Sequence, residues 1–403
     1  MKNMNISQRV QEIPYSAIRK LTPYADEAKA KGKKVYHLNI GAPDTKTPEE
    51  FFYAIKNLDM KTLSYAPSIG VKELREQTAK YYKNKGIDFD SDKEIIITAG
   101  ASEALLFAII AVSEIGERIL TCNPFYSNYY TIFRECGIKP QTFDTTVEDG
   151  YRLPDYETIK ASVTEQTAAI LISNPSNPTG AVYTEDEIRR LVRVAVEEDL
   201  YIIADEVYRE FVFDGAKFKS FAEIEGIEDR LILLDSISKR FGACGARIGS
   251  IACKNKELMA SFVKLATARL AVATVEQIGA TQLYDVSEEY FKEVNEEYQR
   301  RRDCIYNELS KIDGVKIYKP EGAFYIMPQL PIEDAEDFAK WMLTDFDVDG
   351  ETVMIAPGFG FYHNSEVGRN QARLAFVLNV EDLKKAIKIL GLGLEKYKKL
   401  KNL

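Results

Sequence analysis

Short apolar segments alternate with helical patterns between residues 94 and 253, and this alternation limits the fold more than any other feature of the chain. The apolar segments cover 94–100, 117–124, 168–175, 201–208, 231–238 and 247–253. Amphipathic runs at 102–112 and 185–198 separate some of them. Strands that alternate with helices of this length predict a largely parallel sheet covered on both faces. We therefore expect an α/β fold.

The 403 residues contain no internal repeat and no Pro/Gly/Ser-rich linker, so we expect interwoven domains. A large domain is predicted at 48–285. A charged helix from 286 to about 312 is followed by a helix near 335–344 and by strand-like segments at 315–320, 322–328, 352–357 and 372–379. We expect residues 286–403 to form a smaller α+β domain, which the N-terminal segment 1–47 joins.

The composition excludes several classes of function. The net charge is -9 and the cations are interleaved with acids, whereas nucleic-acid binding needs clustered cations. Five cysteines without a CxxC pair, and only two histidines, predict a reducing compartment and no metal site. The first 20 residues lack the apolar stretch of a secretory signal, and no segment approaches the roughly 18 apolar residues that span a membrane. We expect a cytoplasmic protein.

Polar residues follow the predicted strands. Residues 100–102, 174–180, 205–208 and 236–239 each come directly after an apolar run. Because ligands of parallel α/β sheets bind at the carboxyl ends of the strands, these residues are expected to surround one site.

The segment DSISKRFGACGARIG (235–249) carries the strongest chemical signal. Lys239 directly follows a buried strand, with Ser236 and Ser238 before it and Arg247 eight residues later. A lysine in a desolvated site can lose its proton and attack a carbonyl carbon. A single strand-end lysine is more often a solvated surface cation, so the neighbouring motifs decide between the two interpretations.

Those motifs form a consistent pattern. SISK is followed by GARIG, and SNPSNPTG (173–180), ADEVY (204–208) and TAGASEAL (98–105) precede them. GAFY (322–325) and AR (372–373) come later. In this order the chain resembles, over almost its whole length, the fold-type I pyridoxal-phosphate aminotransferases, and most closely prokaryotic aspartate aminotransferases. The resemblance implies transamination between an L-amino acid, with L-aspartate expected, and a 2-oxo acid, with 2-oxoglutarate expected, by a ping-pong mechanism.

The resemblance also implies roles for residues around the cofactor, pyridoxal 5'-phosphate. Lys239 would carry it as a Schiff base and act as the general base. Asp205 would pair with the protonated pyridine nitrogen, which keeps the ring a good electron acceptor. Asn177 and Tyr208 would hydrogen-bond the phenolic oxygen, and Tyr126 would stack on the ring.

A phosphate site is implied at the start of the helix that follows residue 100. A helix N-terminus offers unpaired N–H groups to an anion. The expected phosphate ligands are Gly100, Ala101, Ser102, Ser236, Ser238 and Arg247. Tyr65 resembles the family tyrosine that reaches the phosphate from the neighbouring subunit, which implies a homodimer with shared active sites.

The substrate would be held by Arg373, which resembles the arginine that binds the α-carboxylate through two parallel hydrogen bonds. Gly41, with Ala42, resembles the wall that closes over the substrate. Where one aspartate aminotransferase subgroup has a lysine for the side-chain carboxylate, this chain has Ser102. Arg269 is a candidate for that role, because its segment passes near the opposite active site in the family; a surface helix position is the alternative.

Three other functions stay open. An aromatic or alanine aminotransferase of broad specificity could line an apolar pocket with Ile13, Tyr15, Tyr126 and Phe324. A pyridoxal-phosphate lyase or decarboxylase would share the fold but would not store the amino group. A ligand-sensing regulator would need a DNA-binding module, for which we expect no room.

Overall fold

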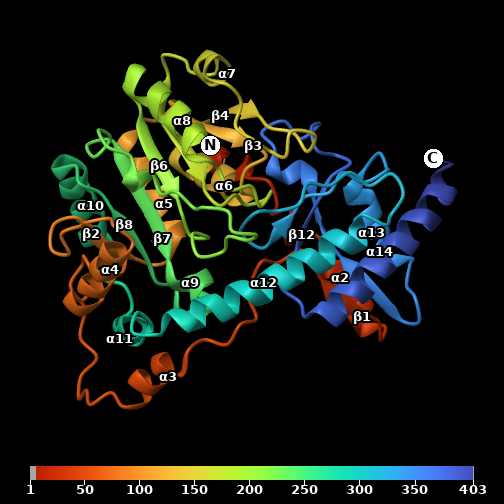
Figure 1. Ribbon diagram of the computed structural model, residues 1–403, viewed down its shortest axis with the longest axis horizontal. Coiled ribbons are helices and arrows are strands. Elements are labelled where there is room, and N and C mark those ends of the chain that lie inside the picture. The colour runs from red at the N-terminus through yellow and green to blue at the C-terminus, as the bar shows by residue number, and fades with distance from the viewer. Residues whose placement is uncertain (1–5, 403) are drawn as a thin grey trace, which may run out of the picture.

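A seven-stranded sheet dominates the computed structural model, which describes residues 6–402 (Figure 1). Residues 1–5 of the predicted small domain, and residue 403, lie outside the described part. The strands, in spatial order, are β2 (Ile95–Thr98), β8 (Gly249–Ala252), β7 (Leu231–Ser236), β6 (Tyr201–Asp205), β5 (Thr167–Ser173), β3 (Arg118–Asn123) and β4 (Lys139–Asp144). Strands β3 to β7 are parallel, and β8 is antiparallel to both β2 and β7. The largely parallel α/β sheet is confirmed.

Both faces of this sheet are covered, and the sequence of β5 shows why. Ile170 and Ile172 pack in one apolar cluster, while Ala169 and Leu171 pack in a second cluster on the other face. One face carries α4 (Lys72–Asn84), α7 (Tyr156–Ala161), α8 (Glu185–Glu197) and α11 (Thr274–Leu283); the other carries α5 (Ala101–Val112), α6 (Ser127–Cys136) and α10 (Lys256–Arg269). A strand buried on both faces must be apolar at every position, which explains the continuous apolar runs.

Helix α8 shows how local sequence sets an element's bounds. Its N-cap Thr184 accepts a hydrogen bond from the Glu187 amide, and the Glu187 carboxylate accepts one from the Thr184 amide at 2.8 Å. This reciprocal capping satisfies two otherwise unpaired donors and fixes the start of the helix. The helix ends at Glu197, one residue before the predicted end.

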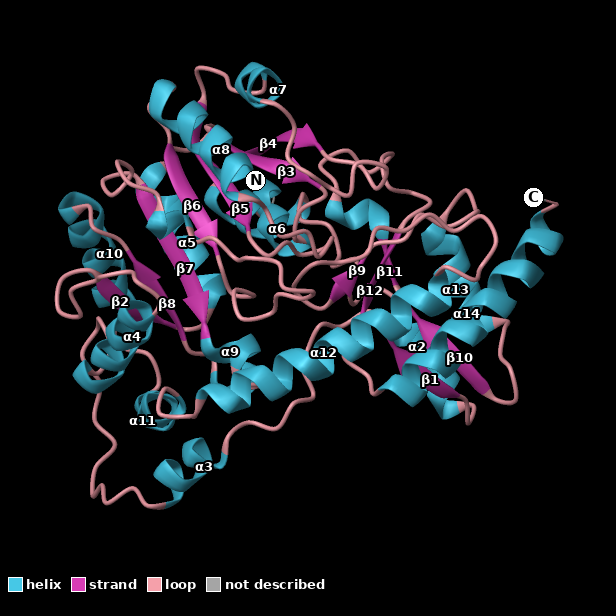
Figure 2. Ribbon diagram, in the orientation of Figure 1, coloured by secondary structure: helices cyan, strands magenta, loops and turns pink. Residues whose placement is uncertain are grey.

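A second, smaller unit contains residues from both ends of the chain (Figure 2). Its elements are α2 (Thr22–Ala30), β1 (Lys34–His37), β9 (Tyr325–Ile326), α13 (Ala335–Thr344), β10 (Glu351–Met354), β11 (Ala356–Pro357), β12 (Ala372–Ala375) and α14 (Val380–Lys401). Strand β1 pairs with β10 in parallel, so an N-terminal strand lies beside a C-terminal one. Segment 315–320 is not a strand, because only Lys316 bridges to Gln329.

Helix α12 (Glu288–Leu309) runs from the large sheet to the second unit, as Figure 1 shows. The remaining short helices are α1 (Gln8–Gln11), α3 (Glu49–Lys56), η1 (Phe221–Glu223), α9 (Ile237–Arg240), η2 (Cys244–Ala246) and η3 (Gly358–Phe361). Within residues 6–402, no helix combines the length and apolarity needed to cross a membrane.

Candidate active site

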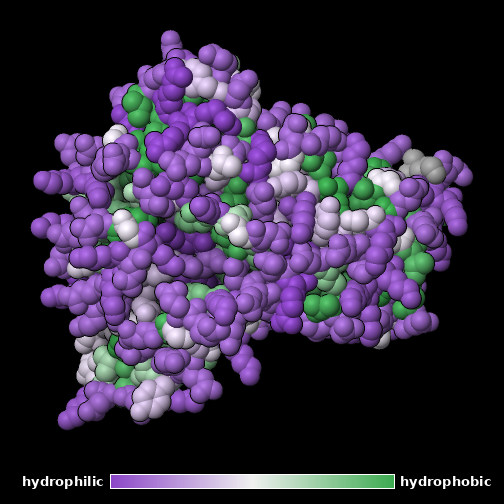
Figure 3. All heavy atoms as spheres, viewed as in Figure 1, coloured by the Kyte–Doolittle hydropathy of each residue, from purple (hydrophilic) through white to green (hydrophobic). Residues whose placement is uncertain are grey.

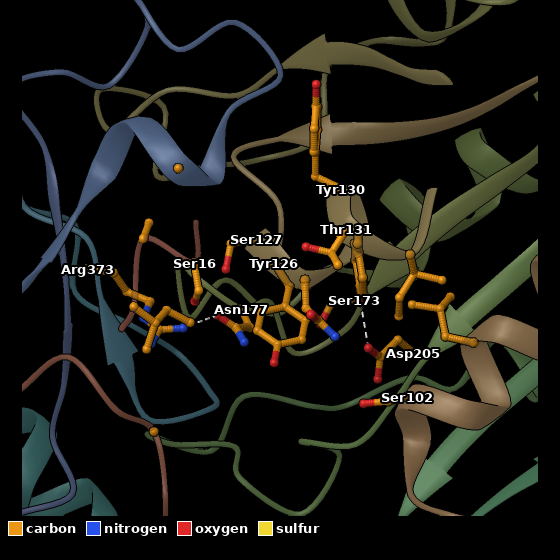
Figure 4. Close-up of a pocket in the computed structure, with 18 of the residues that line it drawn as sticks. Ser16, Ser102, Tyr126, Ser127, Tyr130, Thr131, Ser173, Asn177, Asp205 and Arg373 are labelled. Carbon is orange, nitrogen blue, oxygen red and sulfur yellow. Dashed lines mark hydrogen bonds between the residues drawn. The ribbon is translucent and has the colours of Figure 1, made fainter. Parts of the chain in front are cut away.

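A cavity of about 780 Å³ lies at the carboxyl edge of the large sheet, with residues of the second unit forming its other side. Its walls include the ends of β5, β6 and β7, the start of α5, the N-terminal segment 12–19 and residues near β12. Figure 4 shows Arg373, Ser16 and Asn177 at one side, Asp205 and Ser102 at the other, and Tyr126 between them. The polar residues predicted at strand ends therefore do come together.

Lys239 lies in the short helix α9, which begins directly after β7. Ser236 caps this helix by accepting a hydrogen bond from the Ser238 amide at 3.1 Å. The Lys239 ammonium group donates to the carbonyl oxygen of Gly41 at 2.8 Å and lies 3.9 Å from the sulfur of Cys244. The Lys239 side chain is thus held inside the cavity by a contact with Gly41, which belongs to the N-terminal part of the chain.

Asp205 is the last residue of β6 and is buried. Tyr129 donates a hydrogen bond to its Oδ2 at 2.6 Å, and the Val207 amide donates to Oδ1 at 3.4 Å. Burial raises the pKa of Asp205 to about 6, although the hydrogen bond from Tyr129 lowers it. A buried carboxylate of this kind is stabilised by any cation placed beside it in the cavity.

The predicted phosphate site surrounds the N-terminus of α5. Ala101, Ser102, Ser236, Ser238 and Arg247 all line the cavity. Gly100 caps the helix at φ +79°, and a side chain there would collide with the Arg247 guanidinium group, whose carbon lies 2.9 Å from an ideal Cβ position. The close approach brings the helix N-terminus and an arginine to one point, which suits an anion.

Arg373 is the second residue of β12 and is 1% exposed, yet it lines the cavity. Its Nη1 donates to Oδ1 of Asn177 at 3.0 Å, and its Nη2 donates to the carbonyl oxygen of Asn39 at 2.7 Å. Its buried Nε has no hydrogen-bond partner among the described residues. Because a guanidinium group has five N–H donors, three remain for a ligand.

Two tyrosine hydroxyls meet on the wall near Arg373. The Tyr208 and Tyr325 hydroxyls are 2.8 Å apart, and burial raises the pKa of the Tyr208 phenol, so Tyr208 stays neutral. The guanidinium carbon of Arg373 lies 4.4 Å from the centre of the Tyr325 ring. Tyr126 lies between Arg373 and Asp205 and packs edge-on against Tyr129.

Three predicted site residues do not line this cavity in the protomer: Gly100, which caps α5, Tyr65 and Arg269. Tyr65 is 82% exposed and does not line it. Arg269 forms an ion pair with Glu103 at 3.3 Å and donates to the carbonyl oxygens of Ser68 and Ile97, both at 3.2 Å. The predicted roles of Tyr65 and Arg269 concern a neighbouring subunit's site and stay predictions.

The apolar pocket considered from sequence is only partly formed. Tyr15 and Tyr126 line the cavity, but Ile13 and Phe324 do not. Phe324 lies behind the lysine, with its ring centre 5.7 Å from the Lys239 nitrogen. Ile18, Ile40 and Phe359 also line the cavity, so its apolar surface comes partly from residues that the sequence did not indicate.

Sequence reasoning missed several cavity or supporting residues. Tyr129 belongs to the same NPFYSNYY run as Tyr126, and Tyr325 ends the GAFY motif, so motif spacing offered a signal for both. Asn39, which holds Arg373, precedes Gly41 in NIGAPD. Arg19 lines the cavity without any motif that pointed to it.

These residues fit pyridoxal phosphate. The helix N-terminus with Arg247 and two serines suits a phosphate, and the buried Asp205 suits a protonated ring nitrogen. Lys239 lines the same cavity and can form a covalent bond with an aldehyde. The unpaired Nε of Arg373 leaves a donor for a carboxylate.

Comparisons with known proteins agree with the geometry. Residues 33–390 match the family model described as aminotransferase class I and II. The chain is 34% identical to an aspartate aminotransferase of Pyrococcus abyssi and 33% identical to aromatic-amino-acid aminotransferase 2 of Thermococcus litoralis; each match covers 95% of this chain and 97% of the relative. The structure of an alanine aminotransferase from Pyrococcus furiosus superposes with a TM-score of 0.89 at 29% identity, covering 97% of this chain and all of that one. This chain therefore belongs to the class I and II aminotransferases, whose fold-type I enzymes use pyridoxal phosphate.

Proposed function

We propose that this aminotransferase moves the amino group of L-aspartate to 2-oxoglutarate, with Lys239, Asp205 and Arg373 as its central residues. The observation that carries this proposal is that one cavity holds a lysine, a buried carboxylate and an arginine with free donors. Each group serves a separate need: covalent attachment, charge stabilisation and carboxylate binding.

When bound, pyridoxal phosphate supplies an aldehyde carbon that takes up the amino group and a ring that accepts electron density. Arg247, Ser236, Ser238 and the α5 N-terminus would hold its phosphate. Asp205 would keep a proton on the ring nitrogen through its negative charge, and Tyr129 keeps the carboxylate in place by its hydrogen bond. Tyr126 would stack on the ring.

Arg373 decides which bond of the substrate is broken. A carboxylate held by two parallel hydrogen bonds cannot rotate, so the Cα–H bond is directed at Lys239 rather than the bond to the carboxyl carbon. The Lys239 Nζ would then accept the Cα proton as a general base. A lyase or decarboxylase would use the same groups with a different bond aligned.

The test is the absorbance spectrum of the purified enzyme as L-aspartate, L-tyrosine and L-alanine are added separately, each followed by 2-oxoglutarate. Conversion of the cofactor's aldehyde band to its amine band by L-aspartate, reversed by 2-oxoglutarate, is expected. A larger response to tyrosine or alanine would make the enzyme an aromatic or alanine aminotransferase, in line with the named relatives. No reversal by any 2-oxo acid would favour a lyase and contradict the proposal.

We also propose that the enzyme works as a homodimer with shared sites. Tyr53, Leu63 and Tyr65 are strongly exposed, and Figure 3 shows apolar residues at the lower left of a mostly hydrophilic face, around α3 and α11. An aromatic and apolar surface of this kind is typical of a subunit interface. Tyr65, which lies on this surface, would reach the phosphate site of the partner subunit.

Mixing two inactive variants tests the shared site. In a mixed dimer of Lys239→Ala and Tyr65→Ala subunits, one of the two sites combines an intact lysine with an intact tyrosine. Activity should therefore rise above that of either variant alone, up to half of the native value per dimer. No gain, although mixed dimers are seen by native mass spectrometry, would place Tyr65 outside the partner's site.

A further inference from the structure

Arg19 is a cation of the cavity that the cofactor and the α-carboxylate do not use. Four cationic side chains among the described residues line the cavity: Arg19, Lys239, Arg247 and Arg373. The last three are assigned above to the aldehyde carbon, the phosphate and the α-carboxylate. Arg19 has neither an ion pair nor a side-chain hydrogen bond within residues 6–402.

The backbone that carries Arg19 is held in place although the side chain is exposed. The turn at 16–20 is closed by hydrogen bonds from the amides of Arg19 and Lys20 to the Ser16 carbonyl oxygen, at 3.0 and 2.8 Å. Ala17 and Leu21 on either side of Arg19 are buried. The turn is thus anchored while the guanidinium group remains free for a ligand.

The same turn is connected to Arg373 through one residue. Asn39 donates from its side chain to the Ile18 carbonyl oxygen at 2.7 Å, and its own carbonyl oxygen accepts the hydrogen bond from Arg373. Asn39 is fully buried. The position of Arg19 is therefore tied to that of the α-carboxylate arginine, as the recognition of two ends of one small molecule requires.

The charges of the two arginines reach the same part of the cavity. Burial raises the pKa of the Tyr126 phenol, while both Arg373 and Arg19 act to lower it. Tyr126 lies beside Asn177, the partner of Arg373, in Figure 4. An anionic group next to Tyr126 would therefore be attracted by Arg19.

We propose that Arg19 binds the distal carboxylate of a dicarboxylic substrate, such as L-aspartate or 2-oxoglutarate, and so determines specificity within a single protomer. This inference rests on the proposed function, because it takes Arg373 as the α-carboxylate ligand. Arg19 has a free guanidinium group, whereas Arg269 is already paired with Glu103. Arg19 therefore fits the role better than Arg269 does.

The test compares Arg19→Gln with a matched control, Arg9→Gln. Arg9 is an exposed arginine of the same N-terminal segment that contacts the Glu135 carbonyl oxygen and does not line the cavity. The ratio of kcat/KM for L-aspartate to that for L-alanine should fall about 10- to 100-fold in Arg19→Gln, the range expected for a lost hydrogen bond to a charged group. Arg9→Gln should keep the native ratio, and Arg19→Lys should recover part of it.

A binding measurement separates recognition from turnover. In titration calorimetry of the cofactor-loaded enzyme, Arg19→Gln should weaken the binding of succinate by a similar factor and the binding of butyrate much less. An unchanged succinate affinity and an unchanged kcat/KM ratio in Arg19→Gln would overturn the role of Arg19 and leave the proposed function intact. A native enzyme that does not transaminate L-aspartate at all would instead overturn the proposed function.

Discussion

The two ends of the cavity are built in different ways. At the cofactor end, Asp205, Ser236 and Lys239 extend from the ends of β6 and β7 and are buried or partly buried. At the substrate end, Tyr15, Ser16 and Arg19 lie on an exposed coil and turn. Central strands unfold only when the whole domain unfolds, whereas an exposed turn can change its conformation at a small cost in free energy. We therefore expect substitutions at the sheet end to change the reaction for every substrate, and substitutions in the exposed turn to change mainly the choice of substrate.

The largest effect should come from the sheet end. Lys239→Ala should lower kcat about 1,000-fold or more for every amino acid, because both covalent attachment and proton transfer are lost. Single-turnover assays with aspartate, tyrosine and alanine check this, with the exposed Lys217→Ala as control. A loss confined to one amino acid would break the comparison, since it would make Lys239 a specificity residue.

Asp205 should show the next largest effect, measured on stability. Its pKa of about 6 lies above the ordinary value of 3.8, so between pH 4 and 6 the folded state keeps a proton that the unfolded state releases. The free energy of unfolding of the cofactor-free protein should therefore fall as pH rises through this range, by about 3 kcal/mol at 1.36 kcal/mol per pH unit. Urea unfolding measures this loss as the difference in the pH dependence of the free energy of unfolding between the native protein and Asp205→Asn.

The loss of unfolding free energy that depends on Asp205 should be absent below pH 4 and should reach its full size above pH 6. If native protein and Asp205→Asn respond equally to pH, the carboxyl group is already ionised in the folded state. The cofactor end would then be better solvated than its burial indicates, and the contrast between the two ends would weaken.

Arg373→Lys should lower kcat/KM about 10- to 100-fold for all α-amino acids, because an ammonium group cannot form two parallel hydrogen bonds. Most of the change is expected in KM. Measuring kcat/KM for both variants sharpens the comparison between the two ends of the cavity. Arg373→Lys should affect all α-amino acids, whereas Arg19→Gln should affect dicarboxylic substrates most. Equal losses for aspartate and alanine in both variants would mean that the two arginines are not divided between two carboxylates.

The smallest effect is expected at Tyr129. Tyr129→Phe removes the hydrogen bond to Asp205 Oδ2, which raises the pKa of that carboxyl group further. The dissociation constant of pyridoxal phosphate should rise about 5-fold, in line with one hydrogen bond. Equilibrium dialysis checks this, and Tyr24→Phe, in α2 and outside the cavity, is the control. A lower dissociation constant would show that Tyr129 competes with the cofactor for Asp205.

Much of the fold followed from apolar segments. The continuous runs that became β5, β6 and β7 are visible in the sequence because strands buried on both faces tolerate no polar residue in their middle. Segment 315–320 was harder to predict. Its alternating apolar and polar residues are typical of a strand, but only Lys316 forms a β-bridge, to Gln329. The domain boundaries at 47/48 and 285/286 and the dimer stay predictions.

The family and the cofactor could be predicted from the sequence alone, and so could the candidate residues Lys239, Asp205 and Arg373, because each stands in a short motif with a local order. Only the tertiary structure brought Arg19 to the cavity and tied it through Asn39 to Arg373, more than 350 residues later in the chain. Such contacts depend on how two chain ends pack together, and no local spacing encodes that packing.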